Sequence, residues 1–215
     1  MGLRAKAKKV ADKRAAIIDA AVTLFAHRGF YGTTVPEIAQ AAGIATGSIY
    51  LYFKTKEALV NVALAERKQG MFDAFVLAAN GGGDRETRFR RVWRALVAYA
   101  VAHPADFQFF EMHHHAAYIE PATRAAGDRL MAVAVDFVRE VAAAPLVDRP
   151  GPEILVGLVW GALVGLLKSA DEGYLRLDPQ RVDAAGMVLW HAIGGSTVLA
   201  LPSALPSSSS ERQMP

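Results

Sequence analysis

The 215-residue sequence contains no cysteine. This absence excludes disulfide bonds, cysteine-ligated zinc and thiol nucleophiles, and it is typical of proteins that work in a reducing cytoplasm. The sequence also lacks an activated-nucleophile motif and a glycine-rich phosphate loop. We therefore expect a cytoplasmic protein that is not an enzyme and that needs no cofactor. A hydrolase built on the histidine cluster described below is the enzymatic alternative, and assays on generic esters or phosphates would reveal it.

Long hydrophobic runs are also scarce. Residues 154–167 are apolar throughout but too short for a membrane span, which needs ~20 strongly apolar residues. Residues 184–201 carry no charged side chain, but glycines, His191 and hydroxyl side chains interrupt them. We expect two buried helices here and no membrane contact, with a membrane-associated helical protein as the alternative. The basic N-terminus is followed by no apolar signal core, so we expect no secretory signal.

Net charge is only +3, but its distribution along the chain is uneven. Residues 1–70 carry 11 Lys and Arg against 5 Asp and Glu, a balance of +6, whereas the remainder of the chain carries −3. A basic front on an acidic body indicates an anionic partner at one end of the molecule. Ordinary surface charge would produce the same asymmetry, so composition alone leaves both interpretations open.

Periodic apolar spacing predicts an all-α protein of about nine helices, because no segment shows the alternation typical of strands. The first clear amphipathic stripe is formed by Ile17, Ala21, Leu24 and Phe25. A second helix begins at Thr34, whose hydroxyl can cap free amides while Glu37 completes a capping box. Gly43 ends that helix, and a third short helix follows over residues 46–53.

Two short helices joined by a glycine-containing turn are typical of a helix-turn-helix, here residues 34–53. In such motifs the second helix enters the major groove of DNA with its N-terminal residues near the base edges. Gly47 would let the backbone approach the duplex, Thr46 and Ser48 would hydrogen-bond, and Tyr50 offers both a ring and a hydroxyl. Packing aromatics and a glycine kept for helix packing are the alternatives.

The runs at residues 20–30 and 33–59 resemble the TetR family of bacterial repressors, and the resemblance covers residues 12–70. It implies a homodimer that binds double-stranded, palindromic operator DNA and releases it when a small hydrophobic or amphipathic effector binds. By position, the base-proximal residues are Thr46, Gly47, Ser48 and Tyr50. The phosphate-contacting residues are Thr33, Thr34, Tyr52, Lys54 and Lys56, although the two lysines could be merely solvated. Ala45 stands where the family commonly has a capping serine, so Thr46 is the alternative cap.

The rest of the chain divides around this motif. Residues 71–201 are expected to form a helical ligand-binding and dimerisation domain, with helices near residues 86–102, 105–117, 121–144, 153–170 and 179–199. Residues 202–215 are expected to form a disordered tail. Residues 1–11 form a basic arm that either reaches a minor groove or nearby phosphates, or only keeps the protein soluble.

An aromatic and polar mixture on two consecutive helices indicates a small-molecule site, because such sites combine apolar walls with a few polar anchors. We expect the ligand to contact Trp93, Phe107, Phe110 and His114. Simple core packing is the alternative for the aromatics. We expect no metal at the run His113–His115, since neighbouring helix positions point ~100° apart and Glu111 with one histidine supplies only two ligands. A metal site completed from a distant helix and a pH-dependent sensor are the alternatives.

Three glycines at four-residue spacing, Gly157, Gly161 and Gly165, form one small-residue stripe that lets another helix approach closely. The helix that follows is equally apolar, and the TetR resemblance implies a dimer contact in the last two helices. The expected interface residues are Gly157, Trp160, Gly161, Val164, Gly165, Leu189 and Ile193. Burial of both helices within one monomer is the alternative.

Overall fold

A computed structural model describes residues 2–113, 117–142 and 151–194. Every regular element in these ranges is helical, which confirms the all-α prediction. The nine helices are α1 (Gly2–Arg28), α2 (Val35–Ala41), α3 (Thr46–Ile49), α4 (Lys56–Ala79), α5 (Arg85–Ala102), α6 (Pro104–His113), α7 (Pro121–Val141), α8 (Pro152–Asp171) and α9 (Pro179–Gly194).

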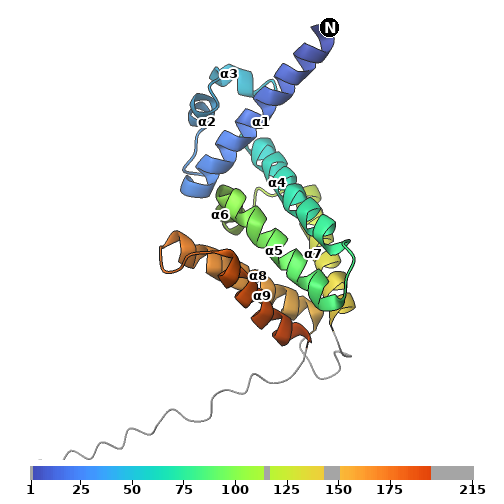
Figure 1. Ribbon diagram of the computed structural model, residues 1–215. Coiled ribbons are helices and arrows are strands. Elements are labelled where there is room, and N and C mark those ends of the chain that lie inside the picture. Colours follow the sequence, from blue (N-terminus) through green and yellow to red (C-terminus); the bar gives the residue numbers. More distant parts are fainter. Residues whose placement is uncertain (1, 114–116, 143–150, 195–215) are drawn as a thin grey trace, which may run out of the picture.

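Helices α1 to α3 form one end of the molecule, which we call the head, and α8 and α9 lie at the opposite end (Figure 1). Helix α4 leaves the head and runs into the body, where it packs against α5 and α7. Helix α1 packs on α6, α5 on α9, and α7 on α8. The head therefore touches the body both through the continuous helix α4 and through the contact between α1 and α6.

The head has its own apolar core, to which each of its helices contributes. Phe25 of α1, Ile38 of α2, Ile49 of α3 and Leu59 of α4 are each at most 2% exposed. Burying a large apolar side chain stabilises a fold by about 1.5–3 kcal/mol. Helix α3 has only four residues, so it owes its position to Ile49 and the core rather than to its own hydrogen bonds.

The predicted capping box is confirmed. The Thr34 backbone amide donates to Glu37 Oε2 at 2.8 Å, and the Glu37 amide donates to Thr34 Oγ1 at 3.4 Å. Hydrogen bonds from Thr34, aided by Arg28 Nη1 at 2.9 Å, hold the pKa of the Glu37 carboxyl below its usual value. Thr55 caps α4 in the same way by accepting from the Ala58 amide at 3.0 Å.

Some helix ends in the structure differ from the predicted boundaries. The backbone of residues 2–11 is helical and continuous with α1, so the expected arm is an extension of that helix. The expected division at residue 70 falls inside α4, which apolar contacts with both ends of the molecule keep unbroken to Ala79. The domain boundary itself stays a prediction. Helix α3 ends at Ile49 instead of residue 53. The tail at residues 202–215 lies outside the described residues.

Helix α8 is longer than its apolar run suggested. Its 20 residues have a mean hydropathy of 1.6, and in the described part of the chain it alone passes a length and composition test for a membrane span. Core helices of soluble proteins pass the same test, so this is weak support for a span. Only 11% of its most apolar stretch is buried within the monomer, so the prediction of a buried helix was wrong for the single chain. Helix α8 presents an apolar face that needs a partner.

Candidate DNA-binding surface and ligand pocket

The turn between α2 and α3 presents one side of α3 to solvent. Gly43 adopts a φ of 67°, a left-handed conformation that favours glycine, and so lets the chain leave α2 sharply. Ile49 points into the core, whereas Thr46 and Gly47 are exposed and Tyr50 is 52% exposed. The first turn of α3 is thus an accessible surface held in place by a buried side chain.

Two details of α3 bear on the predicted base contacts. Ala45 is the N-cap and makes no side-chain capping bond, and Thr46 is the first helical residue. The alternative in which Thr46 serves as the cap was therefore wrong, and its hydroxyl stays available for a partner. A Cβ added at Gly47 would meet nothing within 4 Å, so no neighbour in the fold requires glycine there.

The remaining predicted contacts surround this surface. Thr34 and Lys54 are exposed, and Ser48 and Tyr52 are half-buried. Their contacts with DNA remain predictions. Sequence reasoning missed Leu51, which follows Tyr50 and is 83% exposed. From the sequence, an apolar residue two positions after the buried Ile49 is expected in the core. Only the folded backbone shows that Leu51 faces solvent.

One expected phosphate contact, Thr33, was wrong, whereas that of the half-buried Lys56 stays a prediction. Thr33 is fully buried, and its hydroxyl donates to the Gly29 carbonyl at 2.9 Å, so its side chain cannot reach a duplex. Lys56 Nζ donates to the carbonyls of Phe30 and Thr33 at 2.8 and 2.9 Å and lies 4.1 Å from the centre of the Phe30 ring. Lys56 therefore stabilises the turn after α1, because its ammonium satisfies two carbonyls that no helix bond serves.

A pocket of about 400 Å³ lies in the body between α4, α5, α6, α7 and α8. Its volume is within the range of small-molecule sites, ~300–1,000 Å³. Most of its lining is apolar or aromatic: Met71, Phe75, Phe89, Val92, Leu96, Phe110, Leu130, Met131, Ala134, Phe137, Val138, Val156, Val159, Trp160 and Leu163. Such a lining excludes charged or strongly hydrated molecules unless a specific group pairs with them.

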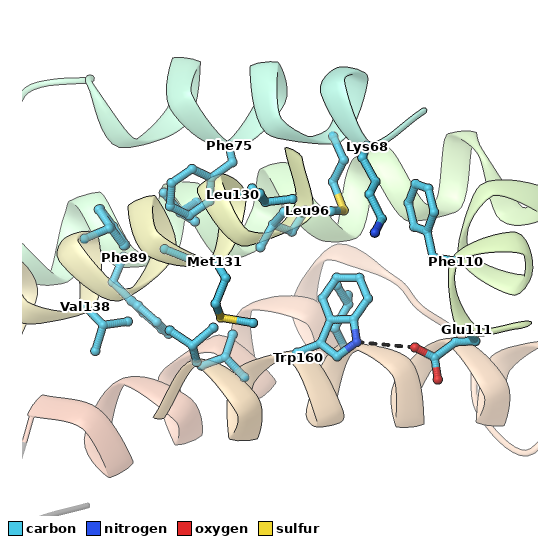
Figure 2. A pocket seen from close by; sticks show the side chains of 18 residues that line it. Lys68, Phe75, Phe89, Leu96, Phe110, Glu111, Leu130, Met131, Val138 and Trp160 are labelled. Atoms are coloured by element: carbon cyan, nitrogen blue, oxygen red, sulfur yellow. Dashed lines mark hydrogen bonds between the residues drawn. The ribbon is translucent and has the colours of Figure 1, made fainter. Parts of the chain in front are cut away.

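The polar groups of the pocket gather at one end of it. Figure 2 shows the Lys68 amine pointing into the pocket near Phe110, Trp160 and Glu111, while Phe75, Phe89 and Val138 line the other end. Glu111 accepts a hydrogen bond from Trp160 Nε1 at 3.4 Å. Sequence reasoning missed Lys68. The available signal was that Lys68, Met71 and Phe75 share one face of α4, so a charged residue interrupts an apolar stripe.

Of the four expected ligand-contacting residues, Phe110 lines the pocket. The prediction for Trp93 was wrong. Its side chain is 1% exposed, and its Nε1 donates to the Val182 carbonyl at 2.7 Å, so it lies in the core between α5 and α9. Phe107 was also wrong, because it is buried behind the pocket wall and stacks on Trp160 at 5.4 Å between ring centres. His114 lies outside the described residues.

The glycine stripe of α8 faces outward. Gly157, Gly161 and Gly165 are exposed, and a Cβ at any of them would meet no atom within 4 Å. Ile154 and Leu158, on the same helix, are each 57% exposed. Val164 and Leu189 are half-buried. This face of α8 is apolar and uncovered in the monomer.

Trp160, an expected interface residue, is half-buried: it lines the pocket and packs on Phe107, and its contact with a partner stays a prediction. The prediction for Ile193 was wrong. Ile193 is 2% exposed and belongs to the core that α9 shares with α5 and α7. On α9 the exposed apolar side chains are instead Met187 and Val188, at 44% and 57%.

Arg67 of α4 links the head to the pocket wall. Its guanidinium forms ion pairs with Asp19 of α1 and, at 3.6 Å, with the buried Asp106 of α6. Tyr99 completes the group by donating to Asp106 at 2.9 Å; burial and the adjacent carboxylate raise the pKa of Tyr99. Asp106 lies one helical turn before Phe110, so the same segment of α6 contacts both the head and the pocket.

Comparison with known families matches both parts of this architecture. Residues 17–63 match the model described as bacterial regulatory proteins of the tetR family, and residues 77–194 match the tetracyclin repressor-like C-terminal domain. The second match alone spans more than half of the chain. The chain belongs to the TetR family.

Individual TetR-family relatives agree. The HTH-type transcriptional repressor KstR2 of Rhodococcus jostii is 37% identical over 94 residues, which are 43% of this chain and 46% of that protein. The fatty acid metabolism regulator protein of Bacillus subtilis is 45% identical over 65 residues, 30% of this chain and 33% of that protein. The chain thus aligns with less than half the length of these curated relatives.

A solved structure extends the similarity to nearly the whole fold. A TetR family transcription regulator from Marinobacter aquaeolei VT8 has a TM-score of 0.76 and 26% identity, with 86% of this chain and 97% of that chain covered. TetR-family regulators are soluble, bind operator DNA and act as dimers. In this chain, the exposed start of α3 and the uncovered face of α8 are the candidate surfaces for those two properties.

Proposed function

We propose that this TetR-family protein is a cytoplasmic, ligand-responsive transcriptional repressor without catalytic activity, released from a palindromic double-stranded operator by a small hydrophobic or amphipathic effector. The observation that carries the proposal is the geometry of α3. Thr46 and Gly47 of α3 are exposed on the same side of the head as Tyr50, the residue that ends the helix, and the buried Ile49 anchors this surface to the core. A helix start with small and hydroxylated side chains suits the major groove, where base edges are read.

Two heads are needed for a palindrome, and the proposed dimer interface is the uncovered face of α8 and α9. Gly157, Gly161 and Gly165 permit close approach of a second α8, while Leu158 and Val188 would lose their exposure to water. The two α3 helices would then have to lie ~34–36 Å apart, one turn of DNA, for both to enter the same face of the duplex.

The proposed effector site is the pocket, and the Arg67 contacts offer a mechanical link from it to the head. A ligand that favours a different position of α6 would move Asp106 relative to Arg67 and so change the restraint on Asp19 of α1. Such a ligand lowers operator affinity only by the difference in its own affinity for the two arrangements.

The function can be tested by titrating the purified protein against fluorescent duplexes from the DNA that flanks its gene. We expect sequence-selective binding that weakens steeply with salt, because phosphate contacts release counterions. Organic extracts of the source cells should raise the apparent Kd of the selected duplex. Equal affinity for a scrambled duplex at every salt concentration would exclude the repressor function.

A Gly47→Ala variant is expected to bind operator less tightly while folding at least as stably as the wild type. The added methyl group meets no protein atom within 4 Å, and alanine favours a helix by ~0.5–1 kcal/mol over glycine. At a groove surface the same methyl group would hold the backbone away from the bases. Thermal unfolding and anisotropy titration measure the two effects. Unchanged operator affinity would show that Gly47 does not face DNA.

A further inference from the structure

The pocket has a long apolar part and one charged end. This arrangement limits which molecules can fill it. Phe75, Phe89 and Val138 line one end without a polar side chain, and Figure 2 shows Lys68 entering at the other end. Among the described residues that line the pocket, Lys68 is the only cation. A molecule that fills the pocket must therefore place an apolar body on one side and meet an ammonium group on the other.

Within the described part of the chain, Lys68 has no neutralising partner of its own. None of the described residues forms a hydrogen bond or ion pair with Lys68 Nζ within the usual distances. Asp128 acts on it only as a more distant charge, and burial lowers the pKa of Lys68. The other carboxylate at this end, Glu111, is exposed and accepts from Trp160 Nε1. A partly buried, unpaired ammonium is costly, so an anion from outside the chain would stabilise it.

The backbone opposite Lys68 also leaves room for its amine. A Cβ added at Gly127, in the first half of α7, would lie 3.3 Å from Lys68 Nζ, a distance that would force the amine to shift. Glycine inside a helix costs stability relative to alanine. At this position it keeps space around Lys68, the one cation among the described residues that line the pocket.

On the basis of the proposed effector role of this pocket, we propose that it binds an amphipathic carboxylate, with the carboxylate on Lys68 Nζ and a single apolar body between Phe75, Phe89 and Val138. A neutral molecule of the same shape would leave the ammonium unpaired. An amphipathic amine would bring a second positive charge to it. The head group therefore decides binding at this site.

Three probes with the same tail separate these possibilities: dodecanoate, dodecanol and dodecylamine, each used below the concentration at which it aggregates. Calorimetric titration into the intact, DNA-free protein should give the tightest binding for dodecanoate. Its Kd should be roughly ten- to a hundredfold below that of dodecanol, the usual worth of a hydrogen bond to a charged group. Dodecylamine should bind weakest.

Substitutions of Lys68 test whether its ammonium group binds the carboxylate. Lys68→Met should bring dodecanoate down to the affinity of dodecanol while leaving dodecanol binding in place, which also shows that the variant is folded. Lys68→Glu should reverse the order and favour dodecylamine. Lys13→Met, which removes an exposed lysine of α1 far from the pocket, should leave the order unchanged.

The inference is overturned if dodecanol or dodecylamine binds the wild type as tightly as dodecanoate, if no probe binds, or if Lys68→Met keeps the preference for dodecanoate. These titrations contain no DNA, so their outcome is separate from that of the repressor function. Carboxylate binding through Lys68 in a protein that never selects a DNA sequence would support the ligand class and reject the repressor. Selective DNA binding without the carboxylate preference would do the reverse.

Discussion

A Gly161→Trp variant is expected to be a folded monomer that no longer binds palindromic operator DNA at concentrations where the wild type saturates it. In the monomer Gly161 is exposed, and its Cβ direction is open, so a large side chain has space there. Between two closely packed α8 helices the same side chain would force the backbones apart. The variant should therefore lose the interface and keep the fold.

The size of the effect follows from the loss of the second head. Linking two binding units raises overall affinity by ~10²–10⁴ over one unit, so the monomer should bind operator weaker by that factor. Sedimentation velocity gives the mass, and anisotropy titration gives the affinity. Gly82→Trp is the matched control, because Gly82 also has open space around its Cβ but lies in the connection between α4 and α5. A dimeric Gly161→Trp protein with normal operator affinity would rule out this face as the interface.

Replacing Trp93 with alanine is expected to lower the free energy of unfolding by about 3–5 kcal/mol, the usual cost of emptying a buried aromatic site. Trp93 is 1% exposed and donates from Nε1 to the Val182 carbonyl of α9. Across the contact, a Cβ at Gly186 would lie 2.6 Å from Trp93 Cδ1, so α5 and α9 meet there without spare volume. The variant would lose packing and the hydrogen bond from the indole to α9.

Denaturant unfolding at a fixed protein concentration measures this cost, since the stability of a dimer depends on concentration. Trp160→Ala is the comparison, because Trp160 is half-buried against an existing pocket and should lose less stability. If Trp93→Ala lowered the free energy of unfolding by less than ~1 kcal/mol and also weakened ligand binding, Trp93 would belong to the ligand site. The structure predicts a large loss of stability for Trp93→Ala and a smaller one for Trp160→Ala.

Local signals in the sequence were sufficient for the head. The hydroxyl of Thr34 and the carboxylate of Glu37 lie three residues apart, and the capping box they predict is present. Gly43 marks the turn, where it adopts a positive φ. These features depend on a few neighbouring residues, and so does the family resemblance. The burial of Thr33 depends instead on how the turn folds back over Leu24 and Gly29, which local spacing does not reveal.

The pocket could not be assembled from spacing, because five helices contribute to it. Aromatic residues crowd α5 and α6, yet Trp93 and Phe107 face the core and Phe110 alone of the three faces the cavity. The interface was also only partly predictable. The four-residue spacing of the glycines predicted one stripe, whereas Trp160 precedes Gly161 by one residue and so points about 100° away from it. That this direction is inward follows only from the packing of α8 on α7.

The central claim is that the exposed start of α3 reads DNA as one of a pair. The most direct measurement is hydroxyl-radical footprinting of the intact protein on the DNA that flanks its gene. The account predicts two protected segments on one face of the duplex, with centres about one helical turn apart and related by two-fold symmetry. Uniform protection without sequence preference, or a single protected segment at saturation, would contradict it.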